Sequence, residues 1–236
     1  MSQNEEYSKG GSQIHRYSEK DFRQTFDDLG DPSIEEIDSH ITKFVGNPET
    51  VLHEVVSPTV HVDIHVIRPT PTRNFYTLVT SGMSDKPMNS PFKGLEYAEL
   101  VICLPPTWEL SEQSIFDERN YWPIRQLKYL ARLPHEFDTW IWATHTIPNG
   151  DPPVQFADNT KTTGVLLAYP RLFGEEFWTL KINPSKEIHF LGLMPIYTEE
   201  MNLKLELGVE ALYKRFTENN ICELLKIDRP NLGLIE

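Results

Sequence analysis

The sequence predicts an α+β fold in which helices flank a central, mixed and largely antiparallel sheet. Segments with strand-like alternation cluster in the middle of the 236-residue chain, and segments with helical spacing stand at its start, centre and end. The two kinds do not alternate as regular βαβ units, so a purely parallel sheet is not expected. A composition of 39% hydrophobic and 24% charged residues suits a soluble globular protein with a substantial core.

The N-terminal region divides into a tail and the start of the domain. Residues 1–15 lack apolar periodicity, so we expect a disordered tail, followed by a single domain over residues 16–236. Phe22 and Phe26 lie four residues apart, which favours a helix over residues 19–29.

The segment DPSIEEIDSHITKFVG predicts a further helix. Ser33 and Glu36 have the spacing of a capping box, and Gly46 stands where a helix commonly ends. One face is apolar and consists of Ile34, Ile37, Ile41 and Phe44. The opposite face carries Glu35, Glu36, Asp38 and Ser39, so we expect an acidic surface there.

After Pro48 the pattern becomes strand-like. Residues 50–57, 59–69, 74–83 and 97–106 are rich in β-branched and aromatic side chains, and short links, several with proline, separate them. Pro105 and Pro106 end the last of these strands, because proline cannot donate a hydrogen bond to a neighbouring strand.

The second half of the chain predicts helices at the centre and end with strands between them. Ile124, Leu127, Leu130 and Ala131 have the spacing of one helix face, which Pro134 should end. Further strands are expected in TWIWATHTI (139–147), GVLLAYP, FWTLKIN and KEIHFLGLMPIY. A last helix follows, with Thr198 as its cap and Gly208 as a break, and its apolar face consists of Leu205, Val209, Leu212, Tyr213 and Phe216.

The strand HVDIHVIRPT poses a question of chemistry. Val60, Val62, Ile64 and Val66 recur at every second position and share one face. His61, Asp63 and His65 share the other face, with His53 on a neighbouring strand. These side chains could hold a metal ion, or they could be the polar side of an ordinary sheet.

Other catalytic patterns are lacking in the sequence. There is no GxGxxG, GxxxxGK, GxSxG or HExxH motif, so no cofactor is expected. Ser81 and Ser84 lie in the run SGMS without a base or oxyanion hole identifiable from sequence. Cys103 and Cys222 are too few for a disulfide framework or a full zinc site, and we expect both to be reduced.

Four tryptophans fall within 35 residues and leave two interpretations open. They could anchor the core, or they could form a protein-binding surface, since tryptophan and tyrosine dominate binding hot spots. Trp140 and Trp142 share one face of the expected strand and Ile141 lies on the other, so at least one of those faces must be covered. The set is Trp108, Trp122, Trp140 and Trp142.

The charge balance bears on partners and location. The net charge is −13, and residues 1–60 hold 12 acidic and five basic side chains. An acidic chain repels phosphate backbones, so we expect no direct nucleic-acid binding, and a basic protein partner would be attracted. With no long apolar run and a polar N-terminus, the expected location is the cytoplasm, without membrane association.

Several segments together resemble one family. These segments occur in the order found in Suppressor of Fused-like domains, over residues of about 50–230, and the resemblance is to the N-terminal lobe alone. They are HVDIHVIRPT, NFYTLVTSGMSD, YAELVICLPPTW, YWPIRQLKYLARLPHEFDTWI and KEIHFLGLMPIYTEEMNLKLELGVEALYKRF.

The resemblance implies a non-enzymatic protein-binding module. The eukaryotic member sequesters transcription factors and clamps a peptide that adds as a β-strand, whereas some short bacterial members are regarded as immunity proteins against toxins, often nucleases. We therefore expect an immunity protein that occludes a basic, nuclease-type toxin. The alternatives are a scaffold that captures a peptide by strand addition, and a metal-dependent enzyme that uses His61, Asp63 and His65. The candidate partner contacts are Glu35, Glu36, Asp38, Asp63, Ser84 and Asp85.

Overall fold

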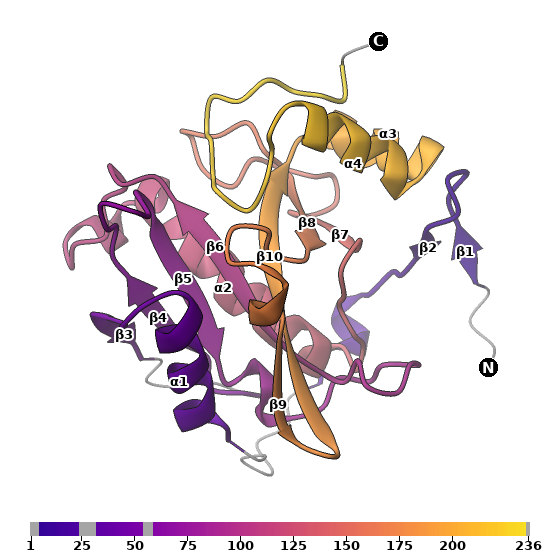
Figure 1. The fold of residues 1–236 in the computed structure, drawn as a ribbon. Helices are drawn as coiled ribbons and strands as arrows, with labels where there is room; N and C mark the ends of the chain where they lie inside the picture. Colours follow the sequence, from indigo (N-terminus) through magenta and orange to yellow (C-terminus); the bar gives the residue numbers. More distant parts are fainter. Residues whose placement is uncertain (1–4, 24–31, 54–58, 235–236) are drawn as a thin grey trace.

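The structure is a computed structural model that describes residues 5–23, 32–53 and 59–234. Its centre is an eight-stranded sheet in the order β3-β4-β5-β6-β10-β8-β7, with β9 paired to β10 (Figure 1). The strands are β3 (Thr50–Leu52), β4 (Asp63–Ile67), β5 (Tyr76–Ser81), β6 (Tyr97–Leu104), β7 (Thr146–Pro148), β8 (Gly164–Ala168), β9 (Thr179–Asn183) and β10 (Lys186–Ile196). β6 and β10 run parallel and the other described pairs are antiparallel, which confirms the predicted fold class.

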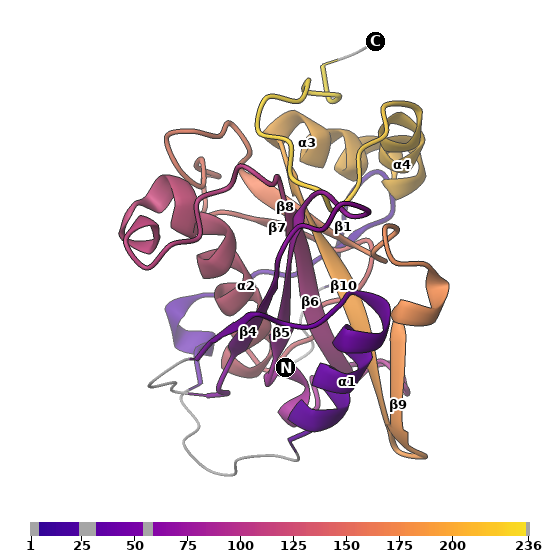
Figure 2. The ribbon, with the colours of Figure 1, turned by 60° about the vertical axis from the view of Figure 1, so that its left-hand side comes forward.

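Two helices cover opposite faces of this sheet (Figure 2). The helix α2 (Glu118–Glu136) packs on one face, where Ile64, Leu100 and Leu127 belong to the largest core cluster. The helix α1 (Ile34–Phe44) packs on the other face against Val79, Val101 and Phe190. Both sides of β4, β5 and β6 are therefore buried.

Helix α1 follows the prediction with two differences. Ile37 and Ile41 are fully buried, but Ile34 is 47% exposed because it precedes the part of the helix that lies on the sheet. Ser33 is the N-cap residue, yet no side-chain capping bond forms, so the expected capping box is absent. Gly46 ends the helix as expected, with φ of 130° and its N–H donating to the Ile41 carbonyl.

Helix α2 extends beyond its predicted end. Asp117 caps its N-terminus by accepting a hydrogen bond from the Arg119 amide. Pro134 lies inside the last turn, and the helix continues to Glu136. Proline affects the hydrogen bonding of preceding residues, so the chain can complete one more half-turn after it.

The predicted strand over residues 139–147 is wrong for most of its length. A strand forms at Thr146–Pro148, and the preceding residues follow an irregular path in which Thr144 has a φ of 77°. Trp140 and Trp142 therefore do not share a strand face.

The described part of the N-terminal region contains secondary structure. Residues 1–15 were expected to be a tail, but β1 (Glu6–Tyr7) and β2 (Gln13–Ile14) form an antiparallel hairpin. Residues 19–21 form a 3-10 turn, and the rest of the helix predicted over residues 19–29 falls largely outside the described residues.

The chain ends with two short helices, α3 (Thr198–Leu207) and α4 (Val209–Glu218), which pack over β8 and the end of β10. Gly208, with φ of 89°, separates them as predicted. The N-cap residue is Tyr197 and not Thr198, which is the first helical residue. Leu212 and Phe216 are the buried members of the predicted apolar face.

Candidate functional site

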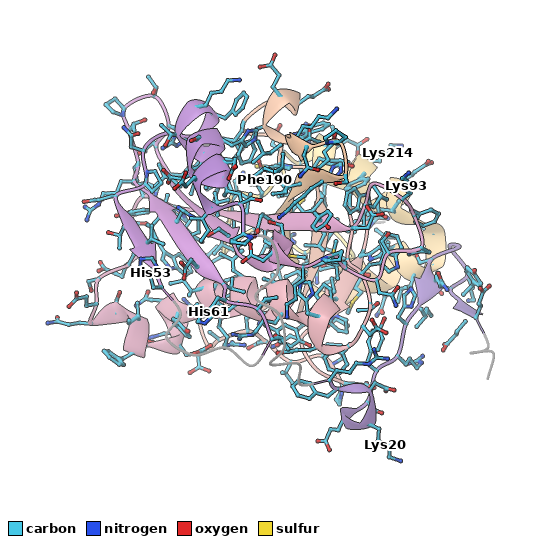
Figure 3. All side chains as sticks on the ribbon, turned by 90° about the horizontal axis from the view of Figure 1, so that it is seen from below. Lys20, His53, His61, Lys93, Phe190 and Lys214 are labelled. Atoms are coloured by element: carbon cyan, nitrogen blue, oxygen red, sulfur yellow. The ribbon has the colours of Figure 1, made fainter. Side chains whose placement is uncertain are left out.

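The side chains of His61, Asp63 and His65 do not converge on one point. His61 is exposed, Asp63 is half-buried, and His65 is 2% exposed beneath α1. Asp63 Oδ2 lies at hydrogen-bond distance from His53 Nδ1, 2.8 Å, whereas His65 Nε2 lies 3.0 Å from Ser81 Oγ. Figure 3 places His53 and His61 on the β3–β4 side of the molecule.

No group of three or more His, Cys, Asp or Glu side chains in the described ranges could hold a metal ion. His65 is also a poor match for a polar sheet face, because α1 covers it. Burial lowers the pKa of His65, and the nearby carboxylates of Asp38 and Asp63 oppose this effect. The imidazole is therefore a neutral, hydrogen-bonded group of the α1 interface.

Ser81, His65 and Asp38 stand in the order of a serine hydrolase triad. His65 Nδ1 lies 3.6 Å from Asp38 Oδ1, on the side of the ring opposite Ser81. Ser81 is 1% exposed, however, and His65 is 2% exposed, so both side chains are shielded from solvent. A substrate has no path to the hydroxyl in this arrangement, so the geometry supports a structural contact.

The segments TLVTSGMSD and YAEL meet at a buried carboxylate that sequence reasoning missed. Glu99 of β6 is fully buried. Its Oε2 accepts from Thr80 Oγ1 at 2.6 Å. Its Oε1 accepts from the Gly82 amide at 3.0 Å, the Ser84 amide at 2.9 Å and Ser84 Oγ at 2.7 Å. The carboxylate thus fixes the turn after β5.

Burial raises the pKa of Glu99 to about 7, against the opposing effect of the hydrogen bonds from Ser84 and Thr80. Gly82 also belongs to this buried contact between β6 and the turn after β5. Its φ is 105°, and a Cβ atom there would lie 1.7 Å from the carbonyl oxygen of His61. Glu99 and Gly82, which are both buried, therefore join the chain segments around β4, β5 and β6.

The segment EIHFLGLMPIYTEEM contributes a second buried carboxylate, which forms an ion pair. Glu200 is fully buried and forms a bidentate pair with Arg229, whose Nη1 and Nη2 donate to its two oxygens at 2.5 and 2.6 Å. The amides of Tyr197 and Leu232 also donate to this carboxylate. The pair attaches the C-terminal segment to the start of α3.

The candidate partner contacts have different surroundings. Glu35 and Glu36 are exposed on α1, and the Asp38 side chain is 51% exposed. Asp63 and Asp85 are half-buried. Ser84 is fully buried against Glu99, so its hydroxyl cannot reach a partner, and it is removed from the set. The acidic residues of α1 and the half-buried Asp63 and Asp85 remain as candidates.

The tryptophans divide between the two interpretations. Trp122 is fully buried and Trp108 is 8% exposed, so these two anchor the core. Trp122 stacks on Phe156 with ring centroids 5.0 Å apart. Trp142 is half-buried beside His189. Trp140 is half-buried at a pocket of about 480 Å³ between the N-terminal segment and the end of α2.

The cysteines are both free thiols. Cys103 is fully buried, and burial raises the pKa of its thiol well above the ordinary value, which suppresses the reactive thiolate. Within the described ranges, every helix is too short or too polar to cross a membrane.

Comparisons with known proteins agree on one family. The family model for Suppressor of fused protein (SUFU) matches residues 58–230. No curated protein sequence matches the chain. A SUFU homologue from Neisseria gonorrhoeae is 19% identical with a TM-score of 0.61, and the match covers 84% of this chain and 95% of that one.

Two further structures share the fold. A chain of the Sufu–Fu complex is 13% identical with a TM-score of 0.59, covering 86% of this chain and 93% of that chain. Drosophila Suppressor of Fused is 13% identical with a TM-score of 0.58, and the match covers 86% of this chain but 52% of that longer one. Because the family model spans most of the sequence, the chain belongs to the Suppressor of fused protein family.

Proposed function

We propose that this protein is a non-enzymatic binding module that neutralises a basic protein toxin, of the nuclease class, by occluding it in the cytoplasm. The SUFU fold is that of a protein-binding domain. The motif residues described above are buried, and their hydrogen bonds support the fold. The observation that carries the finer proposal is the acidic, solvent-facing side of α1.

The α1 surface has the properties of an electrostatic docking face. Glu35 and Glu36 carry no ion-pair partner among the described residues, and Asp38 projects beside them. Ile34, which is 47% exposed, supplies an apolar contact at the same end of the helix. Acidic groups around an apolar contact attract a basic surface and speed its association.

A nuclease is a suitable partner for such a face. Enzymes that grip phosphates do so with clustered lysine and arginine side chains, and an acidic protein can cover that cluster. A net charge of −13 extends the attraction beyond the contact residues themselves.

The test compares two triple variants with equal charge changes. Glu35→Lys, Glu36→Lys and Asp38→Asn alter α1, whereas Glu210→Lys, Glu218→Lys and Asp228→Asn alter exposed positions near the C-terminus. Mass spectrometry of proteins captured by the wild type identifies the partner, and its purified activity is then titrated.

The expected result is a basic nuclease that the wild type inhibits at a one-to-one ratio. The α1 variant should bind at least about tenfold more weakly at low salt and show a flatter salt dependence, while the control triple loses much less. Equal losses in both variants would refute the α1 surface, and a partner without a basic face would refute the toxin proposal.

A second candidate function is capture of an extended peptide by strand addition. In the described sheet, β9 pairs with β10 alone, and Leu180 and Ile182 alternate on its inner face. A peptide could extend the sheet at the outer edge of β9. Proline at the β9 residue whose N–H points away from β10 removes a backbone donor and should abolish such binding.

A further inference from the structure

The N-terminal segment, residues 5–23, lies across the body of the protein and contacts it at two places. The first is the junction between α3 and α4. There the Gly10 amide donates to the Leu205 carbonyl at 2.8 Å, and Lys9 Nζ lies 3.3 Å from Glu206.

This first contact requires glycine. A Cβ atom on Gly10 would lie 2.3 Å from the backbone nitrogen of Gly208 and 2.8 Å from the Lys204 carbonyl oxygen. Both neighbours are backbone atoms, so any side chain at this position must push the segment away. A polypeptide can therefore pack on the α3–α4 junction only if it has a glycine at the position of Gly10.

The second contact lies at the end of α2. Tyr17 Oη lies 2.5 Å from Thr139 Oγ1, and the Tyr17 ring lies 5.4 Å from the Phe137 ring. The Arg23 amide donates to the Glu136 carbonyl at 2.7 Å, and the Arg23 guanidinium pairs with Asp138 at 2.8 Å.

Between these two contacts the segment passes along β7 (Figures 1 and 2). His15 of the segment lines one pocket together with Trp140, and the Trp140 ring lies 4.7 Å from the ring of His145, which directly precedes β7. In the described sheet, β7 pairs with β8 alone. The segment thus lies beside an edge strand whose second side has no strand partner.

Residues 5–23 are loosely packed on the surface beneath them, which is called the seat of the segment. Every residue from 5 to 23 is exposed or half-buried, whereas Thr139 beneath it is 6% exposed. The pocket of about 480 Å³ opens between the segment and residues 89–91 and 137–140. Exposed ion pairs such as Lys9–Glu206 add little stability, so the segment is held by few strong contacts.

We propose that the surface under the N-terminal segment is a docking site for an extended polypeptide of a protein partner. The occupant carries a glycine to pass Gly208 and, seven residues on, an aromatic side chain to pack on Phe137, as the chain's own Gly10 and Tyr17 do. The segment occupies the site in cis and the partner displaces it. This deepens the proposed binding function by adding a site separate from α1.

The test uses a fluorescent peptide of residues 5–23 and the full-length protein. In the wild type the tethered segment competes at an effective concentration of roughly millimolar, so added peptide should bind weakly. The variant Gly10→Val with Tyr17→Ser vacates the seat, and it should bind the peptide at least tenfold more tightly. Gln13→Val adds the same side chain at an exposed position and should behave as wild type.

Two further measurements complete the test. A peptide that itself carries Gly10→Val should fail to bind, and the α1 variant should bind the peptide as wild type does, which separates this site from the toxin surface. Equal peptide affinity for wild type and the vacated variant would overturn the proposal. If the variant with Gly10→Val and Tyr17→Ser does not fold, hydrogen exchange of the wild type tests whether the segment leaves its site.

In the exchange experiment, the Gly10 and Arg23 amides are the probes, because both donate to the body of the protein. Displacement predicts that they exchange at least a hundredfold faster than the Leu100 amide of β6, through local opening. Protection equal to that of Leu100 would mean that the segment leaves only on global unfolding, and it would overturn the proposal.

Discussion

Replacement of Glu99 by glutamine should change how stability depends on pH. The carboxyl group is fully buried, and burial raises its pKa to about 7 from an ordinary value of 4.5. The folded state therefore holds this proton more tightly than the unfolded state does. The stability that the protonated group contributes is complete below pH 4.5 and is lost as pH rises towards 7.

The size of the effect follows from the two pKa values. At about 1.4 kcal/mol per pH unit, the difference between about 7 and 4.5 corresponds to roughly 3 kcal/mol of unfolding free energy. Glutamine keeps the shape of the side chain, and its carbonyl oxygen can still accept the three hydrogen bonds made by Gly82 and Ser84. It does not titrate, so this loss should disappear.

The assay is urea unfolding of the wild type and Glu99→Gln at intervals from pH 4.5 to 8. Histidines of the unfolded chain titrate in this range and also change the stability, so the informative quantity is the difference between the two proteins at each pH. We expect this difference to shift in favour of the variant by about 3 kcal/mol as pH rises.

A constant difference across the range would refute the reasoning. It would mean that the four hydrogen bonds to Glu99 outweigh its burial and keep the carboxylate ionised at all these pH values. Ser84→Ala provides a second control, because it removes one donor to the ionised form and should raise the pKa of Glu99 further.

Three other predictions concern the remaining buried contacts. Glu200→Gln should destabilise the protein by about 3 kcal/mol or more because it leaves Arg229 buried without its charged partner, and in urea unfolding the double replacement of both by methionine should recover much of the loss. Gly82→Ala should cost about 3 kcal/mol or more through its backbone clash, whereas Gly94→Ala, which has a φ of 90° in open space, should cost about 1–2 in the same measurement. Because burial lowers the pKa of His145 to about 4, stability from this group falls as pH drops through 6.5, and NMR should show no titration of its ring between pH 5 and 8.

The fold class could be predicted because its determinants are local. Alternation in β4, β5 and β6 and the apolar face of α1 are properties of short windows, and each forms the expected element. The strand over residues 139–147 failed for the opposite reason. Its alternating aromatic residues are satisfied by separate tertiary contacts, Trp140 with Phe92 and Trp142 with His189, and they impose no strand.

The burial of His65 could not be predicted from the alternation of residues along the strand. Alternation assigns residues to sides of a strand, but it does not say whether another element covers that side. One clue was present. Ile67 shares the side of His65 and is 2% exposed in the α1 core, so the polar row ends in an apolar residue that needs cover.

Glu99 carried a similar clue in the sequence. A single charged residue within the apolar run YAELVICL must find hydrogen-bond donors if the strand is central. Threonine, serine and glycine in TLVTSGMSD supply them, but the register that brings Thr80 and Ser84 to Glu99 is a tertiary property. The partners of a buried charge could not be assigned from spacing along the chain.

The segments that identify the family are those that hold the fold together. Glu99 with Ser84 and Glu200 with Arg229 are interior contacts, so a partner cannot contact them directly. Residues that contact a partner must lie on the surface, where packing does not restrict them. Of the two surfaces proposed here, the acidic side of α1 precedes the matched region 58–230, whereas the surface under residues 5–23 lies within that region, at Phe137, Thr139 and Leu205. Specificity at the first surface should therefore follow α1, and exchange of the solvent-facing residues of α1 between family members should transfer the choice of toxin while leaving the surface under residues 5–23 unchanged.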